Sequence, residues 1–409
     1  MGCRGCRPAE AGLPFWSLVV ISAGDAAQAD WYEAQLKVKR ECGELPLVSF
    51  LCLADPPGPR LGSGGSTLAI LAALSSSYSQ AELDSMRVLV IHAGGFSKRL
   101  PSHSCSGKIF SPLPVQTAGR PYQMLDLKLA LYLPFLNLMQ PGLFITASDD
   151  IEVFNLAEAE CAVAGGKQIT ALAHPSSLYI GTTHGVYVLG TKAGEEDGLV
   201  TVAPCLEVLQ KPSVELMRAR GAVVAGRQGE RVYSDSAFWF PWSTAAQLEL
   251  VWTAAGGAAG LGAEICIYGD LLTCLGERED RDAAARLAAA DPALPSTRAK
   301  QALAAAVRGT GLQVLALHQS RFYHLGTTQE YLHGLTQDKR LRLELNLSNS
   351  VCSRIAPGGE VHGIVLNSVL NHPAVVPSDS VVEYSILDAK VRQSFMTRSL
   401  KILNPPRRR

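Results

Sequence analysis

Short apolar runs alternate with segments of helical pattern through roughly the first 280 residues of the chain. Residues 15–22, 46–55 and 142–150 read as strands, and residues 26–42 and 66–78 read as helices. Strands that alternate with helices are typical of an α/β domain, in which helical crossovers join parallel strands. We therefore expect a largely parallel central sheet, with ligands bound at the carboxyl ends of its strands.

A different periodicity begins after about residue 345. Apolar residues recur every six positions at Val369, Val375, Val381 and Leu387, separated mainly by proline, serine, aspartate and asparagine. Such a period predicts coils of a parallel β-helix, in which each turn covers the apolar face of its neighbour. The alternative is a few irregular strands that cap the first domain.

Length and charge limit the kinds of function. A chain of 409 residues exceeds the usual size of a single core, so we expect two domains. Lys plus Arg and Asp plus Glu both number 37, a balance that argues against general affinity for nucleic acid or an anionic membrane. Any anion site must therefore be local.

The cysteines and the apolar runs favour the cytoplasm. Most of the 10 cysteines lie inside apolar, strand-like runs, as reduced core cysteines do, which predicts a reducing compartment. No apolar run approaches the length of a membrane span, and the amino terminus lacks the apolar core of a secretory signal. We expect a cytoplasmic protein without a membrane partner.

One loop combines bare backbone with a cluster of cations. The strand-like run VLVIHAGG ends at Gly94 and Gly95, and Lys98, Arg99 and Lys108 follow. Paired glycines let backbone N–H groups approach a ligand closely, and arginine and lysine neutralise phosphate oxygens. The loop is therefore a candidate phosphate site.

A second glycine-rich segment, LGSGGST, directly precedes a predicted helix. The free N–H groups and the dipole of a helix N-terminus favour an anion or the edge of a nucleobase there. The segment matches neither G-x-x-x-x-G-K-[ST] nor G-x-G-x-x-G. Its candidate binding residues are Gly62, Gly64, Gly65, Ser66 and Thr67. Two such segments in one α/β domain favour a nucleotide site.

Acidic residues follow strand-like runs at two places. Asp149 and Asp150 come directly after a buried run, and Asp270 ends the segment IYGD. Carboxylate oxygens are the ligands that Mg²⁺ takes when substrate phosphates complete its shell. The alternative for Asp149 is that it caps a helix beginning at Ile151.

Two further polar segments stand in apolar surroundings. One contains Thr183, His184 and Gly185, and the other places Lys211 directly before Pro212. A lysine in such a loop is most often a solvated charge. Beside a phosphate site, however, it becomes a candidate for holding a second anionic substrate.

The order of these residues resembles that of sugar-1-phosphate nucleotidyltransferases. The glycine loop with Arg99 is followed by Gly107-Lys108, Asp149, Lys211-Pro212, Asp270 and finally FYHLGTTQEYL. Longer segments, among them SLVVISAGDAAQADWYEAQL, ALAHPSSLYIGTTHGVYVL and VYSDSAFWF, are similar to the members of that family that form GDP-L-fucose. The similarity covers roughly residues 15–400.

The resemblance implies a Rossmann-like nucleotidyltransferase domain followed by a short parallel left-handed β-helix. The expected divisions are a disordered tail at 1–14, the nucleotidyltransferase (pyrophosphorylase) domain at 15–340, the β-helix-like domain at 341–400 and a basic tail at 401–409. Oligomeric state is left open, because a β-helix either dimerises or only caps a domain.

The resemblance also implies a reaction and residue roles. GTP and β-L-fucose 1-phosphate would give GDP-L-fucose and pyrophosphate, through Mg²⁺-assisted in-line attack of the sugar phosphate on the α-phosphate. Nucleotide contacts would come from Gly62, Gly64, Gly65, Ser66, Thr67, Gly94 and Gly95. The catalytic cations would be Arg99, Lys108 and Lys211, the metal ligands Asp149, Asp150 and Asp270, and the sugar-binding residues Thr183, His184, Gly185 and Lys211.

Two features leave alternatives open. Cys266 stands where relatives are expected to carry a carboxylate, and the chain is expected to be short beyond the β-helix. Both features would permit a catalytically inactive nucleotide-sugar-binding or scaffold paralogue. The other alternative is a fragment of a bifunctional fucokinase-type protein, although we expect no kinase domain to fit beside these domains in 409 residues.

Overall fold

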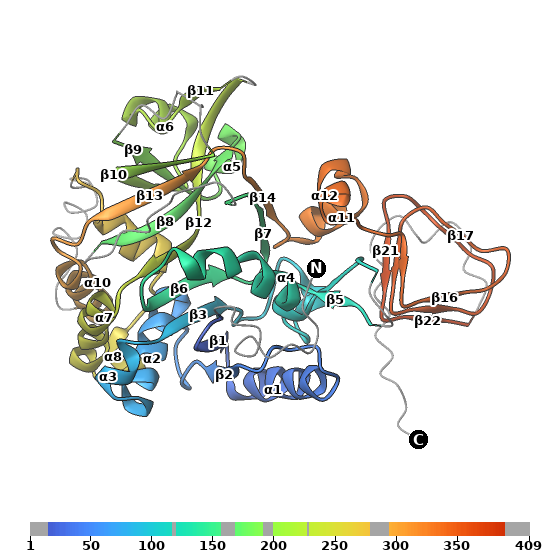
Figure 1. The fold of residues 1–409 in the computed structure, drawn as a ribbon, viewed down its shortest axis with the longest axis horizontal. Coiled ribbons are helices and arrows are strands. Elements are labelled where there is room, and N and C mark those ends of the chain that lie inside the picture. The colour runs from blue at the N-terminus through green and yellow to red at the C-terminus, as the bar shows by residue number, and fades with distance from the viewer. Residues whose placement is uncertain are drawn as a thin grey trace. The chain divides into compact units, whose positions relative to one another are not determined.

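The computed structural model describes residues 15–116, 120–156, 168–190, 199–226, 229–278 and 294–388. The chain divides into two compact units, and Figure 1 labels the helices and strands of both. Unit 1 comprises Met1–Gly94, Tyr132–Ala147 and Phe154–Phe322, and unit 2 comprises Gly95–Leu131, Ser148–Val153 and Tyr323–Arg409. The tails expected at 1–14 and 401–409 lie outside the described residues, and the domain boundaries expected at 340 and 400 stay predictions.

Unit 1 is built on a ten-stranded sheet in the order β2-β1-β3-β6-β12-β8-β13-β10-β9, with β11 paired to β12. The strands are β1 (Leu18–Ala23), β2 (Ser49–Ala54), β3 (Arg87–His92), β6 (Gly142–Ala147), β8 (Ile169–Ser176), β9 (Gly185–Leu189), β10 (Val200–Gln210), β11 (Val224–Gly226), β12 (Gly229–Phe240) and β13 (Leu312–Leu317). The strands predicted at 15–22, 46–55 and 142–150 are confirmed as β1, β2 and β6.

The expectation of a mostly parallel central sheet is wrong. Parallel pairing joins β2, β1, β3 and β6, and also β8 and β13. By contrast, β12 is antiparallel to β6 and β8, and β10 is antiparallel to β13 and β9. Consecutive strands such as β9 and β10, or β11 and β12, pair antiparallel, which needs no helical crossover. The alternating pattern therefore predicts only the first half of the sheet correctly.

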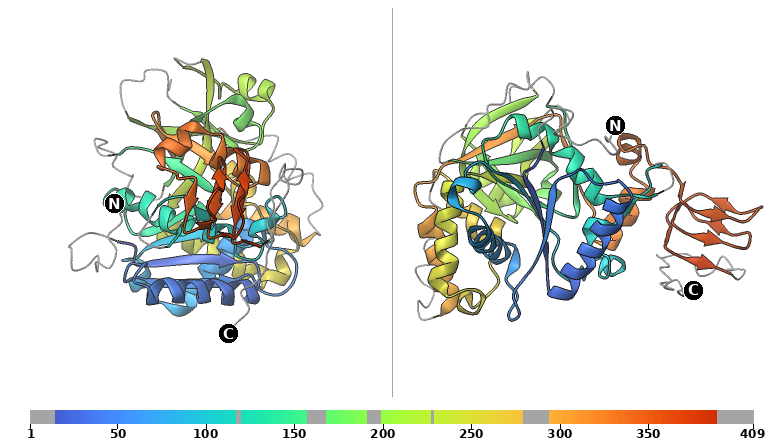
Figure 2. Two further views of the ribbon diagram at one scale, coloured as in Figure 1. Left: turned by 90° about the vertical axis from the view of Figure 1, so that its right-hand side faces the viewer. Right: turned by 60° about the horizontal axis from the view of Figure 1, so that its bottom comes forward.

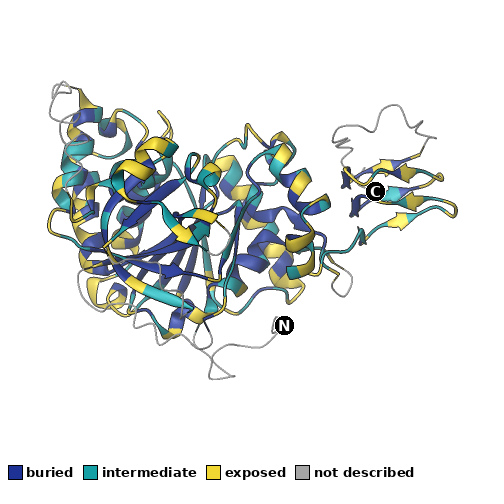
Figure 3. Cartoon of the chain, turned by 90° about the horizontal axis from the view of Figure 1, so that it is seen from above, coloured by how far each residue is buried: buried dark blue, intermediate teal, exposed yellow. Residues whose placement is uncertain are grey.

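Helices cover both faces of the first strands of this sheet. The α-helices in the described part of unit 1 are α1 (Ala26–Glu41), α2 (Gly62–Ser77), α3 (Gln80–Leu83), α5 (Leu178–Gly181), α6 (Val214–Arg220), α7 (Trp242–Ala255), α8 (Ala258–Leu261) and α10 (Pro295–Ala306). Residues of α2, α7 and α10 share one apolar core with Val20 and Val90. Figure 2 shows α1 on the opposite side of these strands, and Figure 3 shows the strands as the buried layer. Helix α2 begins at Gly62, so the glycine-rich segment forms its first turn.

Unit 2 gathers the cation-bearing loop, a short strand and the carboxyl-terminal part of the chain. Its elements are two single turns (Pro101–His103 and Lys108–Phe110), β4 (Pro112–Leu113), β5 (Tyr122–Gln123), α4 (Met124–Leu131), β7 (Asp150–Val153), the end of β14 (Arg321–His324), α11 (Thr328–Thr336) and α12 (Lys339–Glu344). One apolar core includes Leu100 from the loop, Ile151 from β7, and Leu335 from α11. Leu366 and Val381, from strands described next, belong to the same core.

Residues 350–387, here called the ladder region, form three short parallel ladders. The ladders are β15 (Ser350–Val351), β18 (Ile364–Leu366) and β21 (Val381–Glu383); β16 (Arg354–Ile355), β19 (Val369–Leu370) and β22 (Ile386–Leu387); and β17 (Glu360–Val361) and β20 (Val375–Val376). Val369, Val375 and Val381 open successive strands, so the six-residue period correctly marks strand positions. Parallel pairing agrees with a coiled arrangement, and its left-handedness stays a prediction.

None of the helices in the described ranges has the length and apolar character that a membrane span requires.

Candidate active site

The predicted cations lie on the loop that leaves β3. Lys98 and Arg99 are exposed, whereas Lys108 is half-buried at the start of the turn Lys108–Phe110. Gly107, directly before that turn, has φ +75°, a conformation that glycine adopts without steric cost. The loop thus presents two cations to solvent and partly buries a third within unit 2.

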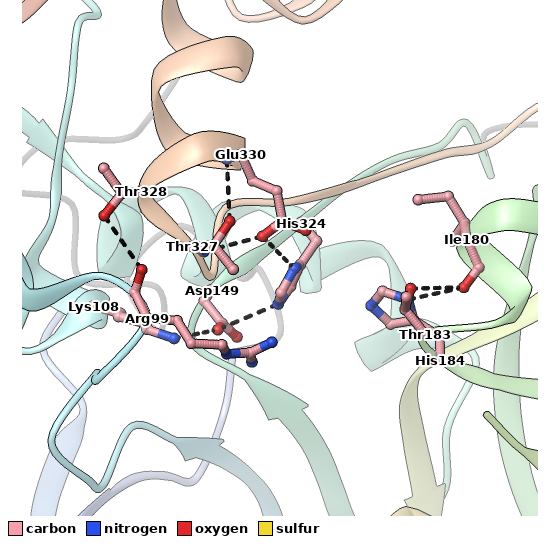
Figure 4. Close-up of polar contacts among 10 residues, drawn as sticks. All are labelled: Arg99, Lys108, Asp149, Ile180, Thr183, His184, His324, Thr327, Thr328 and Glu330. Atoms are coloured by element: carbon pink, nitrogen blue, oxygen red, sulfur yellow. Dashed lines mark hydrogen bonds and ion pairs between the residues drawn. The ribbon is translucent and has the colours of Figure 1, made fainter. Parts of the chain in front are cut away.

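Lys108 meets Asp149, so the structure brings together two residues that the sequence predicts for one site. Lys108 Nζ donates to Asp149 Oδ2 at 2.7 Å, and His324 Nε2 lies 3.5 Å from the same oxygen. The other ring nitrogen of His324 is 2.9 Å from Glu330 Oε2. Figure 4 shows Lys108 and His324 on either side of Asp149. Four charged or ionisable groups therefore alternate in sign, and we call them the ion-pair chain.

The ion-pair chain shifts the pKa values of its members. Burial favours the neutral form of Asp149, but the contacts of His324 and Lys108 outweigh it and hold the pKa of Asp149 well below its usual range. Burial likewise opposes protonation of His324, yet Asp149 and Glu330 raise the pKa of His324 to about 9. At neutral pH Asp149 is therefore ionised and His324 carries a positive charge.

Local backbone geometry fixes the ion-pair chain. The Leu325 N–H donates to the Asp149 carbonyl at 2.7 Å, which holds the segment after β14 beside the start of β7. A Cβ at Gly326 would lie 2.3 Å from His324 Nε2 and 2.7 Å from Asp149 Oδ2, so only glycine fits there. Thr327 and Glu330 form a capping box that begins α11, and this box sets the position of Glu330.

Asp149 does not cap a helix, because the chain continues from Asp150 as strand β7. Asp150 itself is 4% exposed and forms a buried ion pair with Lys128 of α4. Burial raises the pKa of Asp150, although Lys128 opposes that shift. The Asp150 carboxylate is thus already paired with Lys128 inside unit 2.

In unit 1 the glycine-rich segment has a packing role. A Cβ at Gly62 would lie 2.6 Å from the Ile265 carbonyl oxygen, and one at Gly64 would lie 2.6 Å from Ile265 Cγ2. The Gly64 N–H also donates to that carbonyl at 2.7 Å. A Cβ at Gly65 would lie 2.8 Å from Leu61 Cβ. Atoms of Ile265 and Leu61 therefore occupy the space that side chains at these glycines would need. Contact of the glycines with a nucleotide stays a prediction.

Ser66 and Thr67 are buried beside the ends of the parallel strands. Thr67 Oγ1 lies 2.9 Å from His92 Nε2 at the end of β3, and burial lowers the pKa of His92 to about 4. Ser66 contacts Asp55, which directly follows β2, and burial raises the pKa of that carboxyl while Ser66 partly opposes the shift. Polar groups thus gather at the carboxyl ends of β2 and β3, where α/β sheets bind ligands.

The paired glycines after β3 differ from one another. A Cβ at Gly94 would lie 2.9 Å from backbone atoms of Ala23 and Gly24, whereas the corresponding position at Gly95 is open. Gly95 has φ +111°. Gly94 therefore permits close packing of two strand ends, and Gly95 permits the turn into the loop.

Asp270 in unit 1 has local partners for both carboxylate oxygens. One oxygen accepts from the Cys266 N–H at 2.7 Å, and the other lies 2.8 Å from Lys300 Nζ of α10. Cys266 Sγ also accepts from the Gly269 N–H. The segment from Cys266 to Asp270, which departs from the expected E-x-D-x-Y-G-D pattern, is thus a turn held by its own hydrogen bonds. Because Asp270 belongs to unit 1 and Asp149 to unit 2, their binding of one shared ion stays a prediction.

The residues predicted to bind the sugar phosphate do cluster within unit 1. The Lys211 N–H donates to the His184 carbonyl at 3.1 Å, and Lys211 has φ +48°, a left-handed conformation that is uncommon for lysine. The next residue after His184, Gly185, donates its N–H to Asp235 Oδ1 at 2.9 Å. Figure 4 shows Thr183 and His184 together at the end of α5. Strain of this kind is often found at functional sites.

Sequence reasoning missed His324, Gly326, Glu330 and Asp235. The first three lie within the segment FYHLGTTQEYL, whose Thr-x-x-Glu spacing signals a helix start. No pattern in the sequence shows that this start packs beside Asp149. Within the described ranges, no three His, Cys, Asp or Glu side chains form a preformed metal cluster. That finding is compatible with Mg²⁺, which takes few protein ligands when phosphates supply the others.

Polar groups at the strand ends of the sheet in unit 1, and a cation-bearing loop held by Asp149 in unit 2, are features typical of proteins that bind phosphate groups. Comparison of the chain with known proteins identifies the family. Residues 80–394 match the model of the fucose pyrophosphorylase domain. The chain therefore belongs to the fucose pyrophosphorylase family.

Curated relatives agree with that membership. The chain is 38% identical to fucose-1-phosphate guanylyltransferase of Mus musculus over 94% of this chain and 68% of the relative. It is also 38% identical to the Homo sapiens protein of that name, over 92% of this chain and 65% of the relative. A bifunctional fucokinase/GDP-fucose pyrophosphorylase of Arabidopsis thaliana is 29% identical over 52% of this chain and 22% of its own length. The chain thus spans about two thirds of the length of the mammalian relatives.

Proposed function

We propose that this chain is a fucose-1-phosphate guanylyltransferase, which forms GDP-L-fucose and pyrophosphate from GTP and β-L-fucose 1-phosphate. Family membership and the names of the mammalian relatives support the reaction. The structural observation that carries the proposal is the contact of Lys108, on the same loop as Arg99, with Asp149, which His324 also approaches.

The proposed reaction breaks one phosphoanhydride bond and forms another. A phosphate oxygen of fucose 1-phosphate attacks the α-phosphorus of GTP, and the bond from that phosphorus to the bridging oxygen of the β-phosphate breaks. Pyrophosphate leaves with the bonding electrons. Such a reaction needs alignment and charge neutralisation more than covalent catalysis.

We assign the triphosphate to the loop after β3. Lys108 and Asp149 hold each other at 2.7 Å, so the ammonium group is already placed before a substrate arrives. Because Asp149 and Glu330 balance Lys108 and His324, the excess positive charge comes from Lys98 and Arg99, both exposed. Arg99 binds two phosphate oxygens with its planar fork, and Lys108 stabilises the departing pyrophosphate.

Asp149 is the residue we assign to Mg²⁺. Its side chain is 17% exposed, and its low pKa keeps it ionised, so its donor chemistry fits a hard cation. A bound Mg²⁺ would neutralise phosphate charge. Lys108 and His324 both contact one oxygen of Asp149, Oδ2. Asp150 is a weaker candidate because it is only 4% exposed, and Asp270 is weaker because the Cys266 N–H and Lys300 engage both of its oxygens.

We assign the sugar phosphate to Lys211 and the sugar ring to Thr183, His184 and Gly185. The left-handed backbone at Lys211 and its hydrogen bond to the His184 carbonyl link the two segments. We further assign the nucleotide to Gly62, Gly64, Gly65, Ser66, Thr67, Gly94 and Gly95.

Three finer proposals follow from the same family assignment. The ladder region is a short left-handed β-helix, and its parallel ladders support this. The protein acts in the cytoplasm, since the seven described cysteines are all free thiols. Its partners are its substrates rather than nucleic acid, because its charge is balanced.

A substrate screen tests the proposed function. Purified protein is incubated with Mg²⁺, each of four nucleoside triphosphates and each of several sugar 1-phosphates, and pyrophosphate release is measured. We expect turnover that is highest with GTP and fucose 1-phosphate and that disappears when the sugar phosphate is omitted. Binding of GTP without any release would instead favour the nucleotide-sugar-binding scaffold.

A further inference from the structure

A carboxylate occupies an apolar position of the ladder region. In the ladder β15-β18-β21, Val351 pairs with Leu366, and Leu366 pairs with Glu383. The stacked position is thus valine, then leucine, then glutamate. Glu383 is only 4% exposed. Burying a carboxylate is costly unless partners compensate it, and an apolar residue of similar size often fits such a place at least as well.

Two partners of Glu383 come from outside the ladder region. The Tyr331 hydroxyl of α11 donates to Glu383 Oε2 at 3.0 Å. His103 Nε2, on the loop after β3, lies 3.7 Å from the same oxygen. The rings of His103 and Tyr331 meet edge to face, with centroids 4.8 Å apart. One buried oxygen therefore joins the ladder region, α11 and the cation-bearing loop, all within unit 2.

Backbone hydrogen bonds connect the segments of both partners to the residues that carry the predicted catalytic cations. The His103 carbonyl accepts from the Gly107 N–H at 2.9 Å, directly before Lys108. At the start of α11, the Thr328 N–H donates to the Arg99 carbonyl at 2.8 Å. The helix that carries Tyr331 thus holds the backbone of Arg99, and the residue beside Glu383 holds the turn of Lys108.

We propose that Glu383 is a positioning residue for the reaction: through Tyr331 and His103 it fixes the loop that carries Arg99 and Lys108. The proposal rests on the proposed function, since it assigns the loop to the triphosphate. The ladder region would thereby contribute to catalysis. Glu383 lies 275 positions after Lys108 in the chain, but two contacts connect it to the turn of Lys108: Glu383 with His103, and His103 with Gly107.

Substitution of Glu383 by leucine tests whether Glu383 positions the loop after β3 without being needed for the stability of the fold. Glu383→Leu continues the apolar stack of Val351 and Leu366, so we expect a melting temperature close to that of wild type. We expect kcat/KM for GTP to fall about tenfold, because the loop loses its anchor. Glu383→Gln keeps an oxygen that accepts from Tyr331, so it should recover most of the lost activity. Glu360→Gln is the matched control, since Glu360 lies exposed on another ladder.

Amide hydrogen exchange of the full-length protein distinguishes a positioning role from a purely structural one. Only a positioning role predicts faster exchange in the loop after β3. Glu383→Leu and Tyr331→Phe should both speed amide exchange in residues 95–110, while Glu360→Gln leaves it unchanged. The inference is overturned if Glu383→Leu keeps wild-type kcat/KM, or if faster exchange is confined to the ladder region. If Glu383→Leu fails to fold, Tyr331→Phe decides the same question, because it removes the hydrogen bond to Glu383 from the other side. Absence of turnover in wild type would instead refute the proposed function, and exchange would still test the link.

Discussion

Two lysine–aspartate ion pairs of nearly equal length lie in different units of the molecule. Lys108 and Asp149 are 2.7 Å apart in unit 2, and Lys300 and Asp270 are 2.8 Å apart in unit 1. In the first pair, Asp149 also contacts a positively charged His324, and Lys108 follows the Gly107 turn. In the second, Asp270 closes its own turn by accepting from the Cys266 N–H. Distance alone therefore does not distinguish the pair that we propose to be catalytic from the pair that we propose to be structural, and the proposal depends on the further partners of each aspartate.

Replacing Lys108 should have the largest effect. Lys108→Ala removes a placed cation from the departing pyrophosphate, so we expect a loss of roughly 2–4 kcal/mol of transition-state stabilisation. Single-turnover formation of GDP-fucose measures it. Activity within twofold of wild type would show that the pair in unit 2 is not catalytic.

Replacing His324 should produce a pH-dependent loss of stability. The pKa of His324 is raised to about 9 in the folded chain, against about 6.5 when unfolded. Its stabilising contribution is therefore complete below pH 6.5 and is lost as the pH rises through 9. We expect His324→Gln to lower the free energy of unfolding by about 2 kcal/mol near pH 6 and by much less near pH 9.5. Denaturant titration of both proteins at these pH values checks this, and a difference independent of pH would contradict the charged assignment.

Replacing Lys211 should affect one substrate only. If this lysine holds the sugar phosphate, Lys211→Ala should raise KM for fucose 1-phosphate about tenfold, with little change in KM for GTP. Initial rates with each substrate varied in turn give both constants. An equal rise in both would place Lys211 outside the sugar-phosphate site.

Replacing Lys300 should have the smallest effect. Its side chain is 36% exposed, and ion pairs of this kind contribute about 0–1 kcal/mol to stability. We expect Lys300→Ala to retain turnover within about twofold of wild type, because the proposed reaction assigns Lys300 no role and the pair contributes little to stability. A loss as large as that of Lys108→Ala would make Asp270 part of the reacting centre and would remove the contrast between the two units.

Local pattern predicts much of the fold. Strands such as β1 and β6 follow from uninterrupted apolar runs, and the valines at 369, 375 and 381 mark strands of the ladder region. Sheet direction was not predictable in the same way. The antiparallel pairing of β12 with both β6 and β8 depends on contacts between distant segments, which periodicity does not record.

The candidate site shows the same division. Lys108 and Asp149 stand out by type and position, and the structure joins them. His324 does not stand out, because its importance comes from the Leu325–Asp149 hydrogen bond, a tertiary contact. Glycine is ambiguous in sequence: the absent Cβ at Gly64 makes room for Ile265, and the sequence does not distinguish that neighbour from a ligand.

The reverse reaction tests the central claim most directly. Purified protein is incubated with GDP-L-fucose, Mg²⁺ and radiolabelled pyrophosphate, and the nucleotides are separated. We expect that label enters GTP while fucose 1-phosphate forms in equal amount. If no labelled GTP forms although GDP-L-fucose binds, the chain is not a guanylyltransferase.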